Sequence, residues 1–129
     1  MRLRALPMVV ALVAAIGCSP APQTITITIR HSAFDLTRVT VPRGVPVTFV
    51  LVNDDPIDHE WLIGDQEFHE AHRIGTHATH GTEPTEVTVP ALETAETTIT
   101  FSEPGIWSFI CHLPGHEAYG MVGLLTVTD

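Results

Sequence analysis

Apolar and polar residues alternate along most of the chain from residue 24 onward. Residues 24–29 place isoleucine on one face and threonine on the other, which is the period-two pattern of a half-buried β-strand. Similar or strongly apolar stretches occur at 34–41, 45–52, 59–63, 85–89, 96–101, 106–110 and 121–127. Turn signals such as 42–44 and 103–105 separate these stretches. Short strands with little helix predict an all-β fold, an antiparallel Greek-key β-sandwich.

The apolar residues of these strands are sufficient for a single core. We expect the following side chains to point inward: Ile25, Ile27, Ile29, Val47, Phe49, Leu51, Leu62, Val87, Val89, Ile99, Phe101, Trp107, Phe109, Leu125 and Val127. Each large side chain contributes roughly 1.5–3 kcal/mol when fully buried, so the domain can fold without a metal ion. A scaffold that is already folded can impose its geometry on a bound ion.

The segment from residue 64 to residue 84 breaks the alternation. It is polar, and we interpret it as a histidine-rich insertion that can contain a short helix near Phe68. Four histidines that form a candidate secondary metal site lie here: His69, His72, His77 and His80. His69 and His72 would share one face of a helix, because residues three apart are neighbours there. The alternative is a solvated polar loop whose histidines have no common target.

The N-terminus predicts export. Two arginines precede an apolar run at 5–16 that is shorter than the roughly 20 residues of a membrane span. Residues 15–18, Ala-Ile-Gly-Cys, resemble a bacterial lipoprotein cleavage box, although Ala15 stands where leucine is usual. We therefore expect a signal peptide at 1–18, lipidation at Cys18, a short tether at 19–23 and the folded domain at 24–129. An ordinary signal peptide or an uncleaved anchor is the alternative.

Charge and cysteine content narrow the classes of partner. The chain carries 15 acidic and 6 basic residues, for a formal charge of −9. Such a surface repels nucleic acid and anionic lipid headgroups, so we expect no nucleic-acid partner and membrane contact only through a lipid anchor at Cys18. A disulfide between Cys18 and Cys111 is possible in principle, but the several cysteine pairs of a small secreted domain are absent from the sequence. We expect a monomer in the periplasm or on the outer face of the cell membrane.

The strongest chemical signal follows the apolar strand at 106–110. Cys111, His116 and Met121 are spaced as Cys-x4-His-x4-Met. A cysteine and two histidines around a copper ion, with a weak axial methionine, form the blue-copper arrangement. The second histidine is predicted to be His59, since it begins the strand after the 53–58 loop, which a sandwich places at the same end as the loop after Cys111.

Other interpretations explain single residues of this motif but not the whole. A lone cysteine at a strand end is most often a small buried hydrophobe. A structural zinc site prefers four cysteine or histidine ligands and has little use for Met121. A Cys–His nucleophile needs an oxyanion hole and a substrate cleft, for which the sequence gives no signal. The complete spacing, in an exported all-β chain, favours copper.

These residues resemble the cupredoxins, the blue-copper family of plastocyanin, azurin and auracyanin. The resemblance covers residues 24–129; it is strongest in 111–123 and is supported by 41–49. It implies that His59, Cys111, His116 and Met121 hold one copper ion that cycles between Cu(I) and Cu(II). Several members of the family have asparagine after the first histidine ligand, where this chain has Glu60.

The resemblance implies single-electron transfer between redox partners in the cell envelope, without enzyme activity. A donor or acceptor is expected to dock near His116, where four residues can form an apolar patch: Leu113, Pro114, Ala118 and Tyr119. The first alternative is a periplasmic copper-handling or copper-resistance protein that uses the copper site together with the 69–80 segment. A second is an immunoglobulin-like binding module with an inert thiol, which would be colourless in the presence of copper.

Overall fold

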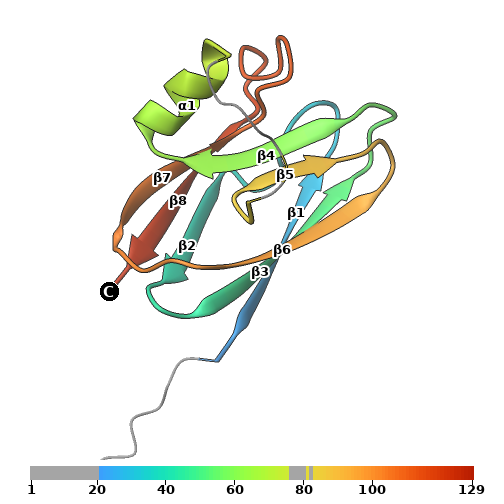
Figure 1. The fold of residues 1–129 in the computed structure, drawn as a ribbon. Helices are drawn as coiled ribbons and strands as arrows, with labels where there is room; N and C mark the ends of the chain where they lie inside the picture. The colour runs from blue at the N-terminus through green and yellow to red at the C-terminus, as the bar shows by residue number, and fades with distance from the viewer. Residues whose placement is uncertain (1–20, 76–80, 82) are drawn as a thin grey trace, which may run out of the picture.

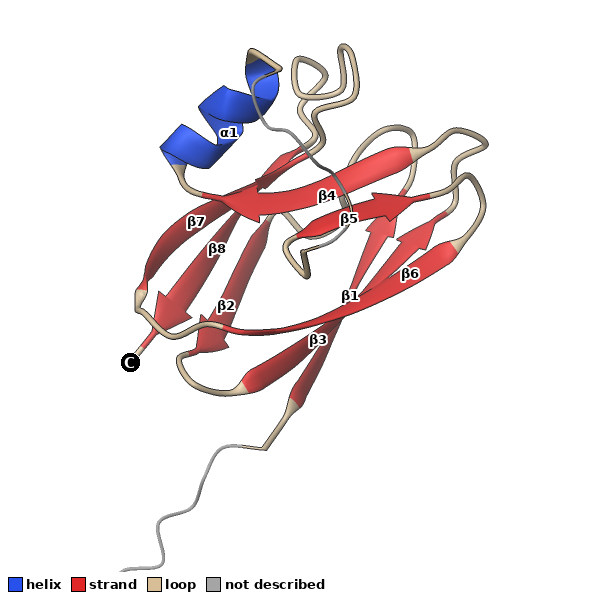
Figure 2. Cartoon of the chain, in the orientation of Figure 1, coloured by secondary structure: helices blue, strands red, loops and turns tan. Residues whose placement is uncertain are grey.

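Eight strands and one short helix form the part of the chain that the computed structural model describes, residues 21–75, 81 and 83–129 (Figures 1 and 2). In chain order they are β1 (Gln23–Ile29), β2 (Arg38–Pro42), β3 (Pro46–Asn53), β4 (His59–Gly64), α1 (Gln66–Arg73), β5 (Glu86–Val89), β6 (Thr94–Thr100), β7 (Gly105–Ile110) and β8 (Val122–Thr128). Several predictions concern residues outside this part: the signal peptide at 1–18, the lipidation of Cys18, the first two residues of the tether at 19–23, and metal binding by His77 and by His80. β1 begins at Gln23, the last residue of the predicted tether.

The strands form two sheets that face each other, which confirms the predicted β-sandwich (Figure 2). The smaller sheet has the order β1-β3-β6 and the larger has the order β2-β8-β7-β4-β5. Four strand pairs have the predicted antiparallel direction, whereas β1 pairs with β3 and β2 pairs with β8 in parallel. β2 crosses to the other sheet between β1 and β3, so the chain enters the smaller sheet twice from the same end.

The core lies between the sheets. Its largest fully buried side chains are the aromatic rings of Trp61, Phe49 and Phe109. The ring centroids of Phe49 and Trp61 are 4.7 Å apart, and those of Trp61 and Phe109 are 5.9 Å apart. Cys111 and Met121 belong to the same buried cluster, so the predicted metal site adjoins the hydrophobic core.

Most of the predicted core residues are buried between the sheets. Three of them are only partly buried, and a fourth is buried on the outer face of the larger sheet. Ile25, Val87 and Trp107 are only partly buried and pack against the edge of the cluster. Leu62 is buried, but it alternates along β4 with Trp61 and Ile63, which belong to the central cluster. It therefore points to the outer face of the larger sheet, on the side where α1 packs (Figure 1).

The histidine-rich insertion contains the short helix α1. Asp65 caps its N-terminus by accepting a hydrogen bond of 2.9 Å from the Phe68 N–H, as expected for an aspartate at this position. The ring of Phe68 occupies the space next to Gly64, where an added Cβ would lie 2.1 Å from a ring carbon. The helix also buries His69, which is 1 % exposed, so this part of the insertion is not a solvated loop.

Candidate metal centre

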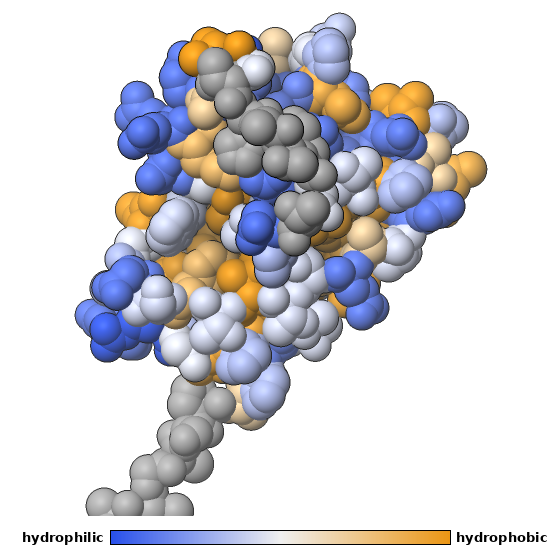
Figure 3. All heavy atoms as spheres, viewed as in Figure 1, coloured by the Kyte–Doolittle hydropathy of each residue, from blue (hydrophilic) through white to orange (hydrophobic). Residues whose placement is uncertain are grey.

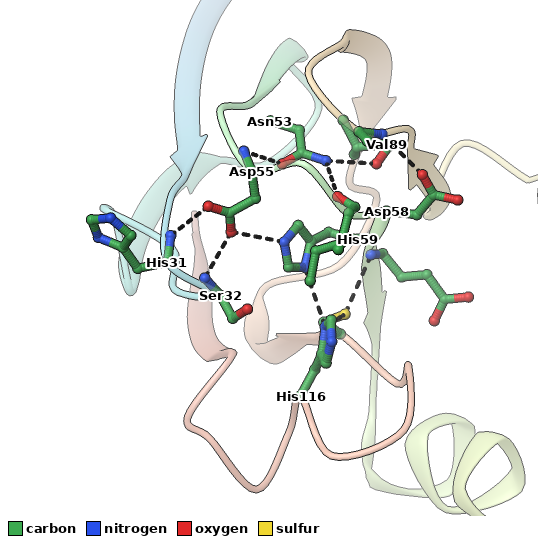
Figure 4. A network of polar contacts seen from close by, with 12 residues as sticks. His31, Ser32, Asn53, Asp55, Asp58, His59, Val89 and His116 are labelled. Atoms are coloured by element: carbon green, nitrogen blue, oxygen red, sulfur yellow. Dashed lines mark hydrogen bonds and ion pairs between the residues drawn. The ribbon is translucent and has the colours of Figure 1, made fainter.

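Two loops at one end of the sandwich bring the predicted ligands together. His59 is the first residue of β4, and Cys111 directly follows β7. The Nδ1 atoms of His59 and His116 lie 3.2 Å apart, and the Cys111 Sγ atom lies 3.3 Å from the His116 Nδ1 atom (Figure 4). The three residues offer ligand atoms that all lie within 4.8 Å of one another. The side chains thus converge on one small space.

Met121 lies next to the same group. It directly precedes β8, is fully buried, and shares the core cluster with Cys111. Its carbonyl accepts a hydrogen bond of 3.1 Å from the Cys111 N–H, and its own N–H donates to the His116 carbonyl at 3.1 Å. These two bonds close the loop at its base and hold Met121 beside both residues.

The loop from Cys111 to Met121 is stabilised internally by tight turns. The His116 N–H donates to the Leu113 carbonyl at 3.0 Å, and the Gly120 N–H donates to the Glu117 carbonyl at 2.9 Å. Gly115 and Gly120 have φ angles of +87° and +100°, which glycine adopts without a steric cost. This chain of turns explains the spacing of the motif, since each glycine reverses the backbone just before a predicted ligand.

A buried carboxylate orients His59. The His59 Nε2 atom lies 2.9 Å from the Asp55 Oδ2 atom, and Asp55 also accepts hydrogen bonds of 2.7 Å from the N–H groups of His31 and Ser32 (Figure 4). Burial opposes ionisation of Asp55, but its hydrogen bonds with Ser32, His31 and His59 hold its pKa below the usual value. An ionised carboxylate accepts the Nε2 proton, so the Nδ1 lone pair of His59 faces the site.

The backbone that surrounds Asp55 has an uncommon conformation. His31 and Ser32 have φ angles of +54° and +52°, in the left-handed region that few residues other than glycine adopt. Two successive N–H groups in this conformation form a concave anion site. The β1–β2 connection is thus shaped around the Asp55 carboxylate.

Asn53 anchors the loop that leads to His59. Its Nδ2 group donates toward the carbonyls of Ile57, Val89 and Pro90 at 2.8, 3.0 and 3.0 Å. Its Oδ1 atom accepts the Asp55 N–H at 3.0 Å. Asn53 is 2 % exposed, so these bonds replace water around a buried amide and hold the β3–β4 loop against the end of β5.

The Cys111 sulfur receives backbone hydrogen bonds. The Glu60 N–H lies 3.3 Å from the Sγ atom. Burial raises the pKa of the Cys111 thiol, and the N–H groups of Glu60 and Leu113 partly offset that effect. Because the donor is the backbone, glutamate in place of asparagine after His59 leaves this contact intact.

The donor set fits one copper ion. Burial, and then the neighbouring His59 ring, lower the pKa of His116, which favours the neutral imidazole, the form that binds metals. A thiolate, two neutral imidazoles and a buried thioether are the ligands that copper selects. In the described part of the chain, His59, Cys111 and His116 are the one group of three cysteine, histidine or acidic residues whose ligand atoms converge.

Two histidines of the predicted secondary site, His69 and His72, are described by the structure, and both lie on α1. The His69 Nε2 atom lies 3.1 Å from the Ser108 carbonyl oxygen, and its Nδ1 atom lies 2.9 Å from the His112 Nε2 atom. The His72 ring stacks on His112 with centroids 5.5 Å apart and an angle of 15° between the rings. Burial lowers the pKa of His69 and brings that of His112 to about 4. Both His69 nitrogens are therefore already engaged within the protein.

Three residues of this region were missed by sequence reasoning. Asp55 and Asn53 lie in the 53–58 loop, to which the sequence assigns no role beyond leading to His59, and His112 has no predicted role. The spacing of Asp55 four residues before His59 was the one available signal, because an acidic residue close to a histidine ligand is a common orienting partner.

Comparison with known proteins identifies the class. Residues 4–127 match the cupredoxin-like domain, and the chain belongs to the cupredoxin family. Cupredoxins are generally electron carriers rather than enzymes. The family match agrees with the sandwich and with the converging cysteine and histidine side chains.

Particular relatives are copper proteins. The chain is 33 % identical over 97 residues to the copper-resistant cuproprotein CopI of Rubrivivax gelatinosus, a match that covers 73 % of this chain and 59 % of CopI. The chain therefore spans less than two thirds of the length of this relative.

Three auracyanin structures are also similar. Auracyanin B has a TM-score of 0.70 and 25 % identity, covering 88 % of this chain and 94 % of its own. Dithionite-reduced auracyanin from Roseiflexus castenholzii has a TM-score of 0.69 and 25 % identity, and the match covers 85 % of this chain and 100 % of that auracyanin. Auracyanin A from Chloroflexus aurantiacus, described as a blue copper protein, has a TM-score of 0.66 and 28 % identity, covering 84 % and 100 %.

Proposed function

We propose that the protein is a blue-copper electron carrier in which His59, Cys111, His116 and Met121 hold one copper ion. The observation that carries this proposal is the convergence of one sulfur and two imidazole nitrogens within 4.8 Å, with Met121 buried beside them. When bound, copper supplies a one-electron couple between Cu(II) and Cu(I).

The protein residues make this couple usable by holding their positions. His59 is fixed by Asp55 and by the buried end of β4, and Cys111 is fixed by the strand that precedes it. Met121 offers a soft, neutral sulfur, which favours Cu(I) and so raises the reduction potential. Ligands that need little rearrangement between the two oxidation states allow rapid electron transfer.

A partner is proposed to approach the side of the site that bears His116. A shallow hollow there is lined mostly by apolar residues and by one acidic residue: Pro56, Ile57, Asp58, Ala91, Leu113, Pro114 and His116. Ile57 and Tyr119 are 47 % and 81 % exposed, and Figure 3 shows hydrophobic residues among hydrophilic ones on the surface at this end of the molecule. An apolar surface around a half-buried ligand allows close approach of a redox partner without a strong charge requirement.

The proposed location is outside the cytoplasm. Members of this family are typically exported, and we propose that the N-terminal segment directs export and that Cys18 carries a lipid anchor. In the described residues, no helix has the length and apolar character needed to cross a membrane. Radiolabelled palmitate incorporated into the wild-type chain but not into a Cys18→Ser variant would support the anchor; equal labelling would contradict it.

The copper proposal is tested by titrating the reduced, metal-free protein with Cu(II). We expect one equivalent to produce an intense thiolate-to-copper band in the visible spectrum, lost on reduction and restored on oxidation. A folded protein with a reduced Cys111 and no such band would contradict the proposal. The His116→Gly variant tests the docking surface, since its electron exchange with a partner should be slow and should recover when imidazole is added.

A second candidate function is copper handling in copper resistance. The similarity to a copper-resistant cuproprotein favours it, and it assigns the additional copper to the histidines of the 69–80 segment other than His69, whose two nitrogens are engaged. It predicts more than one bound copper per chain, with the excess lost in a variant carrying His72→Gln, His77→Gln and His80→Gln. A single tightly bound copper in both proteins would favour the electron carrier.

A further inference from the structure

The helix α1 lies against the outer side of the loop from Cys111 to Met121 (Figure 1). It contacts that loop at two residues, His112 and Glu117, which lie on either side of the turn at Pro114 and Gly115. His112 directly follows Cys111, and Glu117 directly follows His116. The helix therefore holds a residue adjacent to each of two proposed ligands.

The first contact runs through His69. Its Nε2–H donates to the Ser108 carbonyl on β7, so its Nδ1 atom accepts from the His112 Nε2–H at 2.9 Å. His69 thus connects the larger sheet to the ligand loop. The parallel ring of His72, on the next turn of α1, adds a stacking contact to His112.

The second contact is an ion pair between Arg73 and Glu117. The Arg73 Nε atom lies 3.1 and 3.0 Å from the two Glu117 carboxylate oxygens, and its Nη2 atom lies 2.6 Å from Oε1. Glu70, one turn earlier, accepts a bond of 3.1 Å from the Nη1 atom and so steadies the guanidinium. Bidentate pairs of this kind restrict orientation as well as distance.

The helix is held against the larger sheet by packing and hydrogen bonds. Phe68 fills the space beside Gly64, and any side chain at Gly64 would collide with its Cβ and ring atoms at 2.1–2.7 Å. With Asp65 as the N-cap and His69 bonded to β7, α1 is attached to the scaffold independently of the loop. It can therefore transmit the rigidity of the sheet to the loop.

We propose that α1 acts as a brace that holds the Cys111–Met121 loop in its ligand-presenting conformation, with His69 and Arg73 as positioning residues for Cys111 and His116. The inference rests on the proposed copper site, because it assigns a role to residues around that site. It gives the 66–73 part of the histidine-rich insertion a structural purpose that does not require a second metal.

The test measures amide hydrogen exchange in the copper-free protein, in wild type and in Arg73→Gln and Glu117→Gln variants. The amides of His116, Tyr119, Gly120 and Met121, which are hydrogen-bonded within the loop, should exchange up to about fivefold faster in each variant, as expected for losing one well-formed ion pair. Exchange in β3 and β8 should stay unchanged. The charge-swapped double variant Arg73→Glu with Glu117→Arg should restore slow exchange in the loop.

A matched control is Arg43→Gln, which removes a surface arginine that pairs with Asp129 at the other end of the sandwich. It should leave loop exchange at the wild-type rate. His69→Gln tests the other contact and should accelerate exchange at His112 and Leu113 more than at Gly120. Unchanged loop exchange in the Arg73, Glu117 and His69 variants would overturn the brace.

A second measurement separates the brace from the copper proposal. In copper-loaded protein, Arg73→Gln should shift the thiolate-to-copper band and release copper to a chelator faster than Arg43→Gln does. If wild type forms no such band but the exchange results hold, the copper proposal fails and the brace remains. If wild type is blue and loop exchange is insensitive to these substitutions, the brace fails and the copper site remains.

Discussion

The two loops that supply the proposed ligands are held in opposite ways. The β3–β4 loop, which precedes His59, is fixed from within by Asn53 and Asp55, both nearly inaccessible to solvent. The loop from Cys111 to Met121 is fixed by its own turns and, on its outer side, by α1. One half of the site thus depends on buried polar groups, and the other half depends on contacts close to the surface. Substitutions in the β3–β4 loop should therefore lower the free energy of unfolding. Substitutions at the contacts of the Cys111–Met121 loop should mainly make that loop more mobile.

The largest effect should come from replacing the Cys111 sulfur, which contacts the Glu60 N–H on one side and the His116 ring on the other. Cys111→Ser replaces a soft sulfur with a hard oxygen, so we expect the thiolate-to-copper band to disappear while the sandwich remains folded. Visible absorption after Cu(II) addition measures the first effect, and circular dichroism checks the second. A persistent intense band would mean that another sulfur binds the metal. The two loops would then not be the parts of the chain that supply the ligands.

The buried half should be the more costly to disturb in the absence of metal. Asn53→Ala leaves the carbonyls of Val89 and Pro90 and the Asp55 N–H without this partner, which we expect to destabilise the fold by about 2–3 kcal/mol. Urea unfolding of the copper-free protein measures the change. Glu117→Gln, in the Cys111–Met121 loop, should lower the free energy of unfolding much less. Equal losses in the two variants would contradict the difference between the two loops.

Asp55→Asn should act on the metal more than on the fold. Loss of an orienting carboxylate typically weakens metal binding about 10–100-fold. Removing a negative charge beside His59 should disfavour Cu(II) and raise the reduction potential, by about 59 mV for each tenfold change in the ratio of Cu(II) to Cu(I) affinity. Asp58→Asn is the matched control, since Asp58 caps the Ala91 N–H instead of contacting His59. Equal shifts in both variants would argue against orientation of His59 by Asp55.

The smallest expected effect is a pH dependence on the side of α1. Burial lowers the pKa of His69, which also faces Arg73, His72, His112 and Glu117. The unfolded chain should therefore take up a proton below about pH 6.5, before the folded chain does. The free energy of unfolding of the copper-free protein should fall as the pH drops from about 6.5 toward 5. His69→Gln should reduce this slope, and an unchanged slope would show that His69 does not cause it.

The candidate ligands could be named from the sequence because their residue types and spacing are local, and the structure brings His59, Cys111 and His116 together. The spacing of Cys111, His116 and Met121 follows from turns that glycine marks, and the alternation in 24–29 identified a strand directly. The pairing of β1 with β3 in parallel could not be predicted, since alternation shows which face is buried but not which strand lies alongside. The same limit hid the path of β2 between the sheets.

The supporting residues were harder to predict because their roles depend on distant parts of the chain. Asp55 acquires its role from the N–H groups of His31 and Ser32, which belong to another loop. The sequence indicates that His69 belongs to a polar loop or to a secondary metal site. In the structure, Phe68 packs beside Gly64, and His69 lies buried against β7. A metal ligand can be recognised from its residue type, but an orienting residue is recognised only from its neighbours.

The hydrogen bond from the Glu60 backbone to the Cys111 sulfur offers a practical opportunity for engineering. Because the donor is the main chain, the side chain at this position can be replaced without removing the contact to sulfur. A neutral or cationic residue at position 60 would then change the electrostatic field at the site while the surrounding hydrogen bonds remain. A graded series of variants at this one position could serve as a set of electron carriers with different driving forces on a common scaffold.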